Sequence, residues 1–193
     1  MSQNTPAKVP PPESAKRQRV MESAMAVVLR YGFQRTTMED VAKEAGISRP
    51  ALYLHFANKT EIYRALAESI MGKALDAARA ALEGGGSIEA RVFLAVKAGI
   101  LDPTDVMMAT AHGAELLDMK HSIAAEALRT WRQKKTAMLA AALESSGAAT
   151  AKGMSGGQLA DILLDGMEGL KLRATSSAER EEGARSLVRL VAG

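Results

Sequence analysis

The fold is decided by residues 37–63, TMEDVAKEAGISRPALYLHFANKTEIY. This stretch predicts two short helices joined by a tight turn, with a third helix starting just after them. Thr37 and Ser48 are favoured N-cap residues, and Gly46 suits the left-handed conformation that ends a helix. Asn58 begins an N-x-x-E capping box for the third helix. A helix, a short turn with glycine and a second helix predict a helix-turn-helix, which places its second helix in the major groove of DNA.

The apolar positions support this layout, because they recur at helical spacing and can close a small shared core. The second helix is predicted over residues 49–56, with Leu52 and Phe56 facing that core. An upstream helix, ending at Gly32, supplies the third wall. The residues left outside on the second helix are short, basic or aromatic, as expected of a helix that enters a DNA groove: Arg49, Ala51, Tyr53, Leu54 and His55.

Residues 17–66 resemble the N-terminal signature of the TetR/AcrR family of transcriptional regulators. The resemblance extends through three helices and their caps, and it rests on these residues: Tyr31-Gly32-Phe33, Thr36-Thr37, Val41-Ala42, Ala45-Gly46-Ile47-Ser48, Leu52-Tyr53, His55-Phe56 and Asn58-Lys59. It implies an all-α regulator that binds a palindromic operator in double-stranded DNA.

The resemblance also implies which side chains contact DNA. Thr37, Tyr53 and Lys59 fall on family positions that contact phosphates. Arg49, Ala51 and His55 fall nearer the bases. Pro50 departs from the family pattern; proline is tolerated in the first turn of a helix, but it removes a backbone donor there.

Charge is distributed unevenly along the 193 residues. Residues 1–60 hold nine Lys or Arg and five Asp or Glu, a net charge of +4, whereas residues 61–193 hold 16 basic and 17 acidic residues, a net charge of −1. The excess therefore coincides with the predicted helix-turn-helix, as phosphate binding requires. An ordinary solvated surface would explain the same excess.

Composition excludes several classes of protein. The chain has no Cys, which excludes disulfides and Cys-based zinc sites. No apolar run approaches the length of a membrane span, and the N-terminus lacks the apolar segment of a secretory signal. We therefore expect a cytoplasmic, nucleoid-associated protein that does not bind membranes.

Three regions are predicted along the chain. Residues 1–13 form a disordered, proline-rich arm, and Lys8, Lys16, Arg17 and Arg19 could let it contact the DNA backbone; alternatively, it is a solvated tail without a role. Residues 14–60 form the helix-turn-helix domain, completed to about residue 66, and residues 61–193 form a helical effector-binding and dimerisation domain. About nine helices are expected, because strand signals are nearly absent. Those after the motif cover residues 58–82, 88–98, 104–117, 122–145, 158–174 and 178–191, with a break at Asp102–Thr104 and a loop over 148–157.

Residues 158–193 are predicted to hold a homodimer together. One stripe runs through Leu159, Ile162, Leu163, Gly166, Met167 and Leu170, and a second through Ala184, Leu187, Val188 and Val191. Gly166 and Gly169 would let helices approach closely, so the pair could pack on a two-fold copy of itself. Alternatively, both helices finish the core of a single chain.

The second domain is rich in Met, which adapts to varied apolar ligands. A small hydrophobic effector would contact these candidate residues, although plain core packing explains each of them singly: Met71, Met107, Met108, His112, Glu115, Trp131 and Met138. His112 and Glu115 lie one turn apart but lack further ligands, so no metal is expected. No cofactor motif or catalytic arrangement is visible, and we expect no enzyme activity.

These observations predict a ligand-responsive, sequence-specific regulator of transcription, a repressor that a small hydrophobic effector releases from its operator. One alternative is an all-helical enzyme or small-molecule-binding protein that uses the Met-rich region directly and binds DNA only incidentally. A third possibility is a regulator without a small-molecule effector that a protein partner controls.

Overall fold

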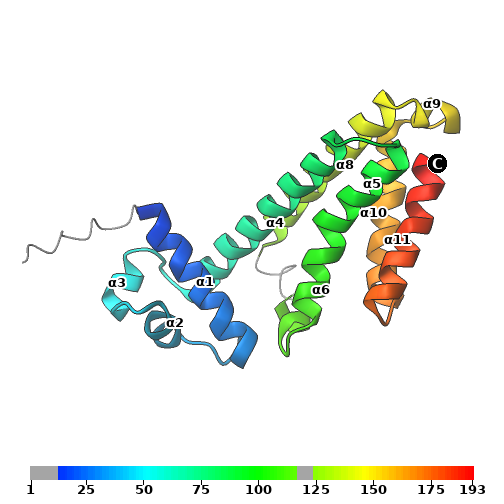
Figure 1. Cartoon of the computed structure of the whole chain (residues 1–193). Coiled ribbons are helices and arrows are strands. Elements are labelled where there is room, and N and C mark those ends of the chain that lie inside the picture. The colour runs from blue at the N-terminus through cyan, green and yellow to red at the C-terminus, as the bar shows by residue number, and fades with distance from the viewer. Residues whose placement is uncertain (1–12, 117–123) are drawn as a thin grey trace, which may run out of the picture. The chain divides into compact units, whose positions relative to one another are not determined.

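The computed structural model describes residues 13–116 and 124–193. Across these ranges the secondary structure is all helical, as predicted, with ten α-helices and one π-helical segment (Figure 1). The predicted arm lies outside the described residues except for Glu13, which begins helix α1. None of the described helices is long and apolar enough to cross a lipid bilayer.

The chain divides into two compact units, one ending at Leu66 and the other beginning at Ala67. Helix α4 (Lys59–Glu83) contributes residues to both units. The first unit also holds α1 (Glu13–Tyr31), α2 (Met38–Ala45) and α3 (Arg49–Tyr53). Its core is built from fully buried side chains of all four helices and the turn after α3: Val27, Val28, Val41, Leu52, Phe56 and Ile62.

Local capping fixes where the short helices begin and end. Thr37 forms a capping box with Asp40, whose backbone N–H the Thr37 hydroxyl accepts. Gly46 has a φ of 67°, a left-handed conformation that lets α2 end and the chain turn. The Ser48 hydroxyl accepts a hydrogen bond from the Ala51 N–H and so starts α3. These three predictions from the sequence are confirmed.

Helix α3 is shorter than predicted. It ends at Tyr53, because the N–H groups of both His55 and Phe56 donate to the Leu52 carbonyl and close a turn. That turn brings Phe56 into the core, where its side chain is 1% exposed. His55 therefore lies beyond the helix rather than on it.

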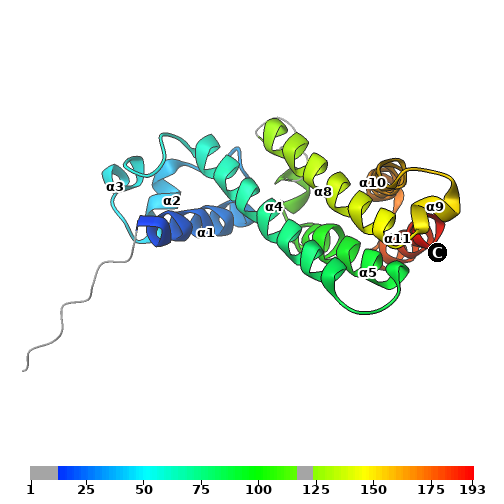
Figure 2. The ribbon, with the colours of Figure 1, turned by 90° about the horizontal axis from the view of Figure 1, so that it is seen from above.

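The second unit contains the remaining helices. They are α5 (Ile88–Val96), the π-helical segment η1 (Lys97–Leu101), α6 (Asp102–Met108), α8 (Ala125–Ser145), α9 (Ala148–Lys152), α10 (Gly156–Arg173) and α11 (Ser177–Ala192). Figure 2 shows α8, α10 and α11 packed beside one another. Two glycines let α10 and α11 pack closely against each other. A Cβ on Gly166 would lie 2.7 Å from Leu187 Cδ2, and a Cβ on Gly183 would lie 2.5 Å from Leu170 Cδ1.

Three boundary predictions in this unit are wrong. The helix does not break at Asp102–Thr104, because η1 passes directly into α6 and its wider turn accommodates Pro103. The predicted 104–117 helix is interrupted, since α6 ends at Met108 and a turn follows. The predicted loop at 148–157 contains α9, which two left-handed glycines delimit, Gly147 and Gly153.

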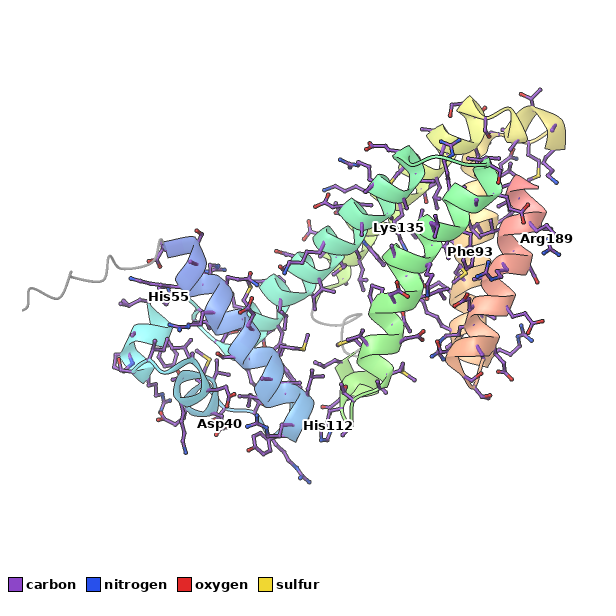
Figure 3. The ribbon with its side chains drawn as sticks, in the orientation of Figure 1. Asp40, His55, Phe93, His112, Lys135 and Arg189 are labelled. Carbon is purple, nitrogen blue, oxygen red and sulfur yellow. The ribbon has the colours of Figure 1, made fainter. Side chains whose placement is uncertain are left out.

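A row of side-chain pairs joins α11 to the helix formed by α5, η1 and α6. Arg189 lies 3.7 Å from Glu89, and the Arg185 guanidinium stacks 3.8 Å from the centre of the Phe93 ring (Figure 3). Farther along, Lys97 lies 3.5 Å from Glu181. The row ends at Asp105, which accepts hydrogen bonds from Ser177 and from Arg180, whose Nε lies 2.9 Å away. Oppositely running helices are thus joined along their whole shared length.

Candidate nucleic-acid interface

Helix α3 presents one buried side chain and a polar, aromatic outer face. Leu52 is fully buried, whereas Arg49, Pro50 and Tyr53 are exposed and Ala51 is half-buried. Arg49 Nη2 lies 3.4 Å from the Tyr53 hydroxyl, one helical turn away. A guanidinium and a phenol are therefore held together on an exposed helix, a pair that can donate to base edges and phosphates.

Thr37 lies exposed at the N-terminus of α2, but its hydroxyl is already engaged. The Thr37 hydroxyl donates to Asp40 Oδ2 over 2.6 Å and accepts from the Asp40 N–H over 3.2 Å. The hydrogen bonds from Thr37 lower the pKa of the Asp40 carboxyl. To contact a phosphate, the Thr37 hydroxyl would have to give up its hydrogen bond to Asp40 and donate to a phosphate oxygen instead.

Lys59 does not project as a free cation. Its ammonium group donates to the carbonyls of Phe33, Gln34 and Thr36 over 2.9, 3.3 and 3.0 Å. An ammonium has three donors, and all three are used here. The predicted phosphate contact is thus not supported by this geometry; Lys59 instead fastens the turn between α1 and α2.

His55 is also placed differently from the prediction. Its side chain is 12% exposed, and Nδ1 lies 2.6 Å from Glu13 Oε1 at the start of α1 (Figure 3). The imidazole is therefore directed toward α1 rather than outward beside Arg49. The turn after Leu52 causes this, because it ends the helix before His55 can join the outer face.

Arg17 holds the end of α3 from outside the motif. Its Nη1 donates to the His55 carbonyl over 2.6 Å, and its guanidinium carbon lies 3.9 Å from the centre of the Phe56 ring. Its Nη2 lies 3.8 Å from Glu61. A cation at the C-terminal end of a helix satisfies carbonyls that have no partner within it. Sequence reasoning assigned Arg17 only to a basic arm, because nothing local links it to a residue 38 positions later.

The candidate effector residues are distributed over several helices of the second unit. Met71 lies on α4, Met107 and Met108 on α6, and Trp131 and Met138 on α8. Met138 packs against the core, whereas Met108 is exposed. The structure pairs His112 with Glu115 at 3.5 Å. Lys135 lies 3.6 Å above the Trp131 ring, and the buried Trp131 Nε1 has no hydrogen-bond partner among the described residues.

Metal binding finds no support in the described ranges. They contain no group of three or more His, Asp or Glu placed to hold an ion.

Most of the predicted dimer stripe faces the core of its own chain. Four side chains of the α10 stripe and three of the α11 stripe are buried: Leu159, Leu163, Met167, Leu170, Ala184, Val188 and Val191. Outside, α10 leaves Ile162 and Leu172 exposed, and a Cβ on Gly169 would meet nothing within 4 Å. The stripe is buried because α10 and α11 must first cover α5 and α8.

Comparison with known proteins agrees with this geometry. Residues 20–66 match the family described as bacterial regulatory proteins, tetR family. The first unit therefore carries a helix-turn-helix of the TetR family. Over 56 residues the chain is 39% identical to the HTH-type transcriptional regulator YfiR of Bacillus subtilis, and over 54 residues it is 41% identical to the HTH-type transcriptional regulator TtgR of Pseudomonas putida. The matches cover 29% and 28% of this chain, and 27% and 26% of those relatives.

Solved structures extend the likeness in fold to most of the chain. A transcriptional regulator from Cytophaga hutchinsonii aligns with a TM-score of 0.75 and 17% identity, covering 93% of this chain and 100% of that one. SmeT, the repressor of the Stenotrophomonas maltophilia multidrug efflux pump SmeDEF, aligns with a TM-score of 0.64 and 16% identity over 90% of this chain and 88% of that one. At such identities the likeness shows a shared fold for the second unit.

Proposed function

We propose that this chain is a ligand-responsive regulator of transcription of the TetR family that binds a palindromic operator through α3. One observation carries the proposal: a fully capped helix-turn-helix exposes Arg49 and Tyr53 on the helix that follows the turn. The net charge of +4 over residues 1–60 supports a polyanionic partner. The relatives named above are regulators of transcription, which does not favour the alternative of an enzyme with incidental DNA binding.

Selection of duplexes from a random pool tests this function. We expect an inverted repeat with half-site centres about 34–36 Å apart, because a two-fold dimer places two α3 helices in successive major-groove faces. The Arg49→Ala variant, selected in parallel, should accept more bases at one position in each half-site. Enrichment of no sequence by the unaltered protein would contradict the proposal.

The effector is proposed to be a small hydrophobic molecule that binds the second unit and releases the protein from its operator. Helix α4 supports this coupling, because the helix that carries Lys59 continues to the core residues Ala78 and Leu82 of the second unit. If the second unit has two packings, an effector that binds one of them more tightly shifts the protein toward that packing. The affinity for the operator then falls by an amount set by the difference in effector affinity between the two packings. Thermal shift of the full chain with apolar ligands, followed by loss of operator binding at the same concentrations, tests it.

The homodimer is proposed to form through residues 158–193, with the outward face of α10 at its centre. Gly169 provides the test, because a side chain there meets nothing within the chain. We expect Gly169→Leu to stay folded but sediment as a monomer, since the leucine would separate the two α10 helices. Gly72→Leu is the matched control: Gly72 is a helical glycine that is equally open. A Gly169→Leu chain that remains dimeric would exclude this face.

A further inference from the structure

The outermost ridge of α3 is apolar. In an α-helix each residue turns about 100°, so positions two before and two after a given residue lie nearly opposite it. Leu52 points into the core with none of its surface exposed. Pro50 and Leu54 are the residues two positions away on either side. Leu54 keeps helical geometry, with φ −69° and ψ −22°, so the relation extends to it.

Leu54 is the most exposed of the large apolar side chains that the structure describes in the first unit. It is 85% exposed, and its neighbour in sequence, Tyr53, is 43% exposed and pairs with Arg49. Exposing a leucine to this extent forgoes the free energy of burying it, about 1.5–3 kcal/mol, unless a partner covers it. The partner must fit a surface whose neighbouring groups suit phosphates and base edges.

We propose that Leu54, supported by Pro50, contacts the 5-methyl groups of thymine bases and so determines specificity at that position of the operator. The inference rests on the proposed function, because it requires α3 to enter the major groove. The ridge opposite Leu52 is then the part of α3 that reaches deepest. Thymine presents its methyl group on the floor of that groove, where an apolar side chain distinguishes it from cytosine.

Removing the methyl group alone tests this inference. The probe is the tightest duplex that the unaltered full-length protein selects from a random pool, with each thymine replaced in turn by deoxyuridine. At one or two thymines in each half-site, we expect the replacement to weaken binding about fourfold, as the loss of one buried methyl group predicts. Leu54→Ala should weaken binding to the thymine duplex by about tenfold and should bind the thymine and uracil duplexes equally.

Two controls separate the possible failures. Leu172→Ala removes a leucine that is 91% exposed on α10, and it should keep the full preference for thymine. Circular dichroism should show that the Leu54→Ala variant has the same melting temperature as the unaltered protein. If Leu54→Ala retains the thymine preference, or if no thymine is sensitive to loss of its methyl group, the inference is wrong while the proposed function stands. If no duplex is preferred at all, both the proposed function and this inference are wrong.

Discussion

Arg17 and Lys59 in the first unit donate to backbone carbonyls, whereas Arg180 and Lys97 in the second unit bind carboxylates. The difference follows from helix length. Helices α2 and α3 have only eight and five residues, too few to be stable alone, so Lys59 holds the turn before α2 and Arg17 holds the turn after α3. The second unit is built around longer helices, such as α8 with 21 residues and α10 with 18, whose buried faces hold them together, and its charges join helix surfaces. Net charge therefore overstates how many cations of the first unit are free to face phosphates.

The largest effect should come from removing the Lys59 ammonium. Lys59→Met retains most of the apolar stem but leaves the carbonyls of Phe33 and Thr36 without their charged donor. We expect a loss of about 2–4 kcal/mol in the free energy of unfolding, measured by urea denaturation. Lys43→Met, which removes an exposed lysine from α2, should cost less than about 0.5 kcal/mol. If the two variants are equally stable and only Lys59→Met loses DNA affinity, the result would instead support the predicted contact between Lys59 and a phosphate.

Arg17→Met should have an intermediate effect on stability and a selective effect on DNA binding. Loss of the bond to the His55 carbonyl and of the stacking on Phe56 should cost about 1–2 kcal/mol. Because α3 is then less firmly oriented, affinity for the preferred duplex should fall about tenfold or more, while affinity for random duplex stays nearly unchanged. Arg17→Lys should recover part of the specific affinity. Equal loss on both duplexes, with a reduced salt dependence, would instead show that Arg17 contacts a phosphate.

The smallest effect is expected in the second unit, at Asp105. Its partial burial raises the pKa of the carboxyl, but the hydrogen bonds from Ser177 and Arg180 outweigh burial and lower that pKa overall. A lowered pKa in the folded state adds stability above the unfolded pKa, near 4, and that stability is lost as the pH falls through the folded value. Asp105→Asn should therefore cost about 1 kcal/mol at pH 7, and the difference should shrink below about pH 4. Asp76→Asn, an exposed control on α4, should show no such difference, and thermal unfolding across pH 2–7 measures both.

The comparison also explains what could be predicted from the sequence. The caps at Thr37, Gly46 and Ser48 are confirmed because each depends on groups within a few residues. The all-helical fold and the family are confirmed for the same reason, since composition and a local motif determine them. The positions of His55 and Lys59 could not be predicted, because their partners Glu13 and Phe33 are distant in sequence and meet them only after folding.

The second unit is harder to predict, because its apolar stripes do not reveal what will cover them. Leu163 and Val188 fit a dimer stripe and a monomer core equally well, and only the packing of α10 and α11 shows that they lie inside. The sequence predicts a break at Pro103 because proline usually ends a helix, whereas the helix continues from η1 into α6. A π-turn has no sequence signature that distinguishes it from an α-turn.

That π-turn acts as a one-residue insertion that corrects the rotational phase of a helix. Asp105 follows Glu89 by 16 residues, which in an unbroken α-helix would place the two about 160° apart around the axis. The extra residue in η1 takes back about 100° of that rotation, so both carboxylates face α11 and reach Arg180 and Arg189. If the same 16 residues formed an unbroken α-helix instead, Asp105 would lie on the far side of the helix from Arg180. The width of one turn thus determines whether α6 is attached to the last helix of the chain.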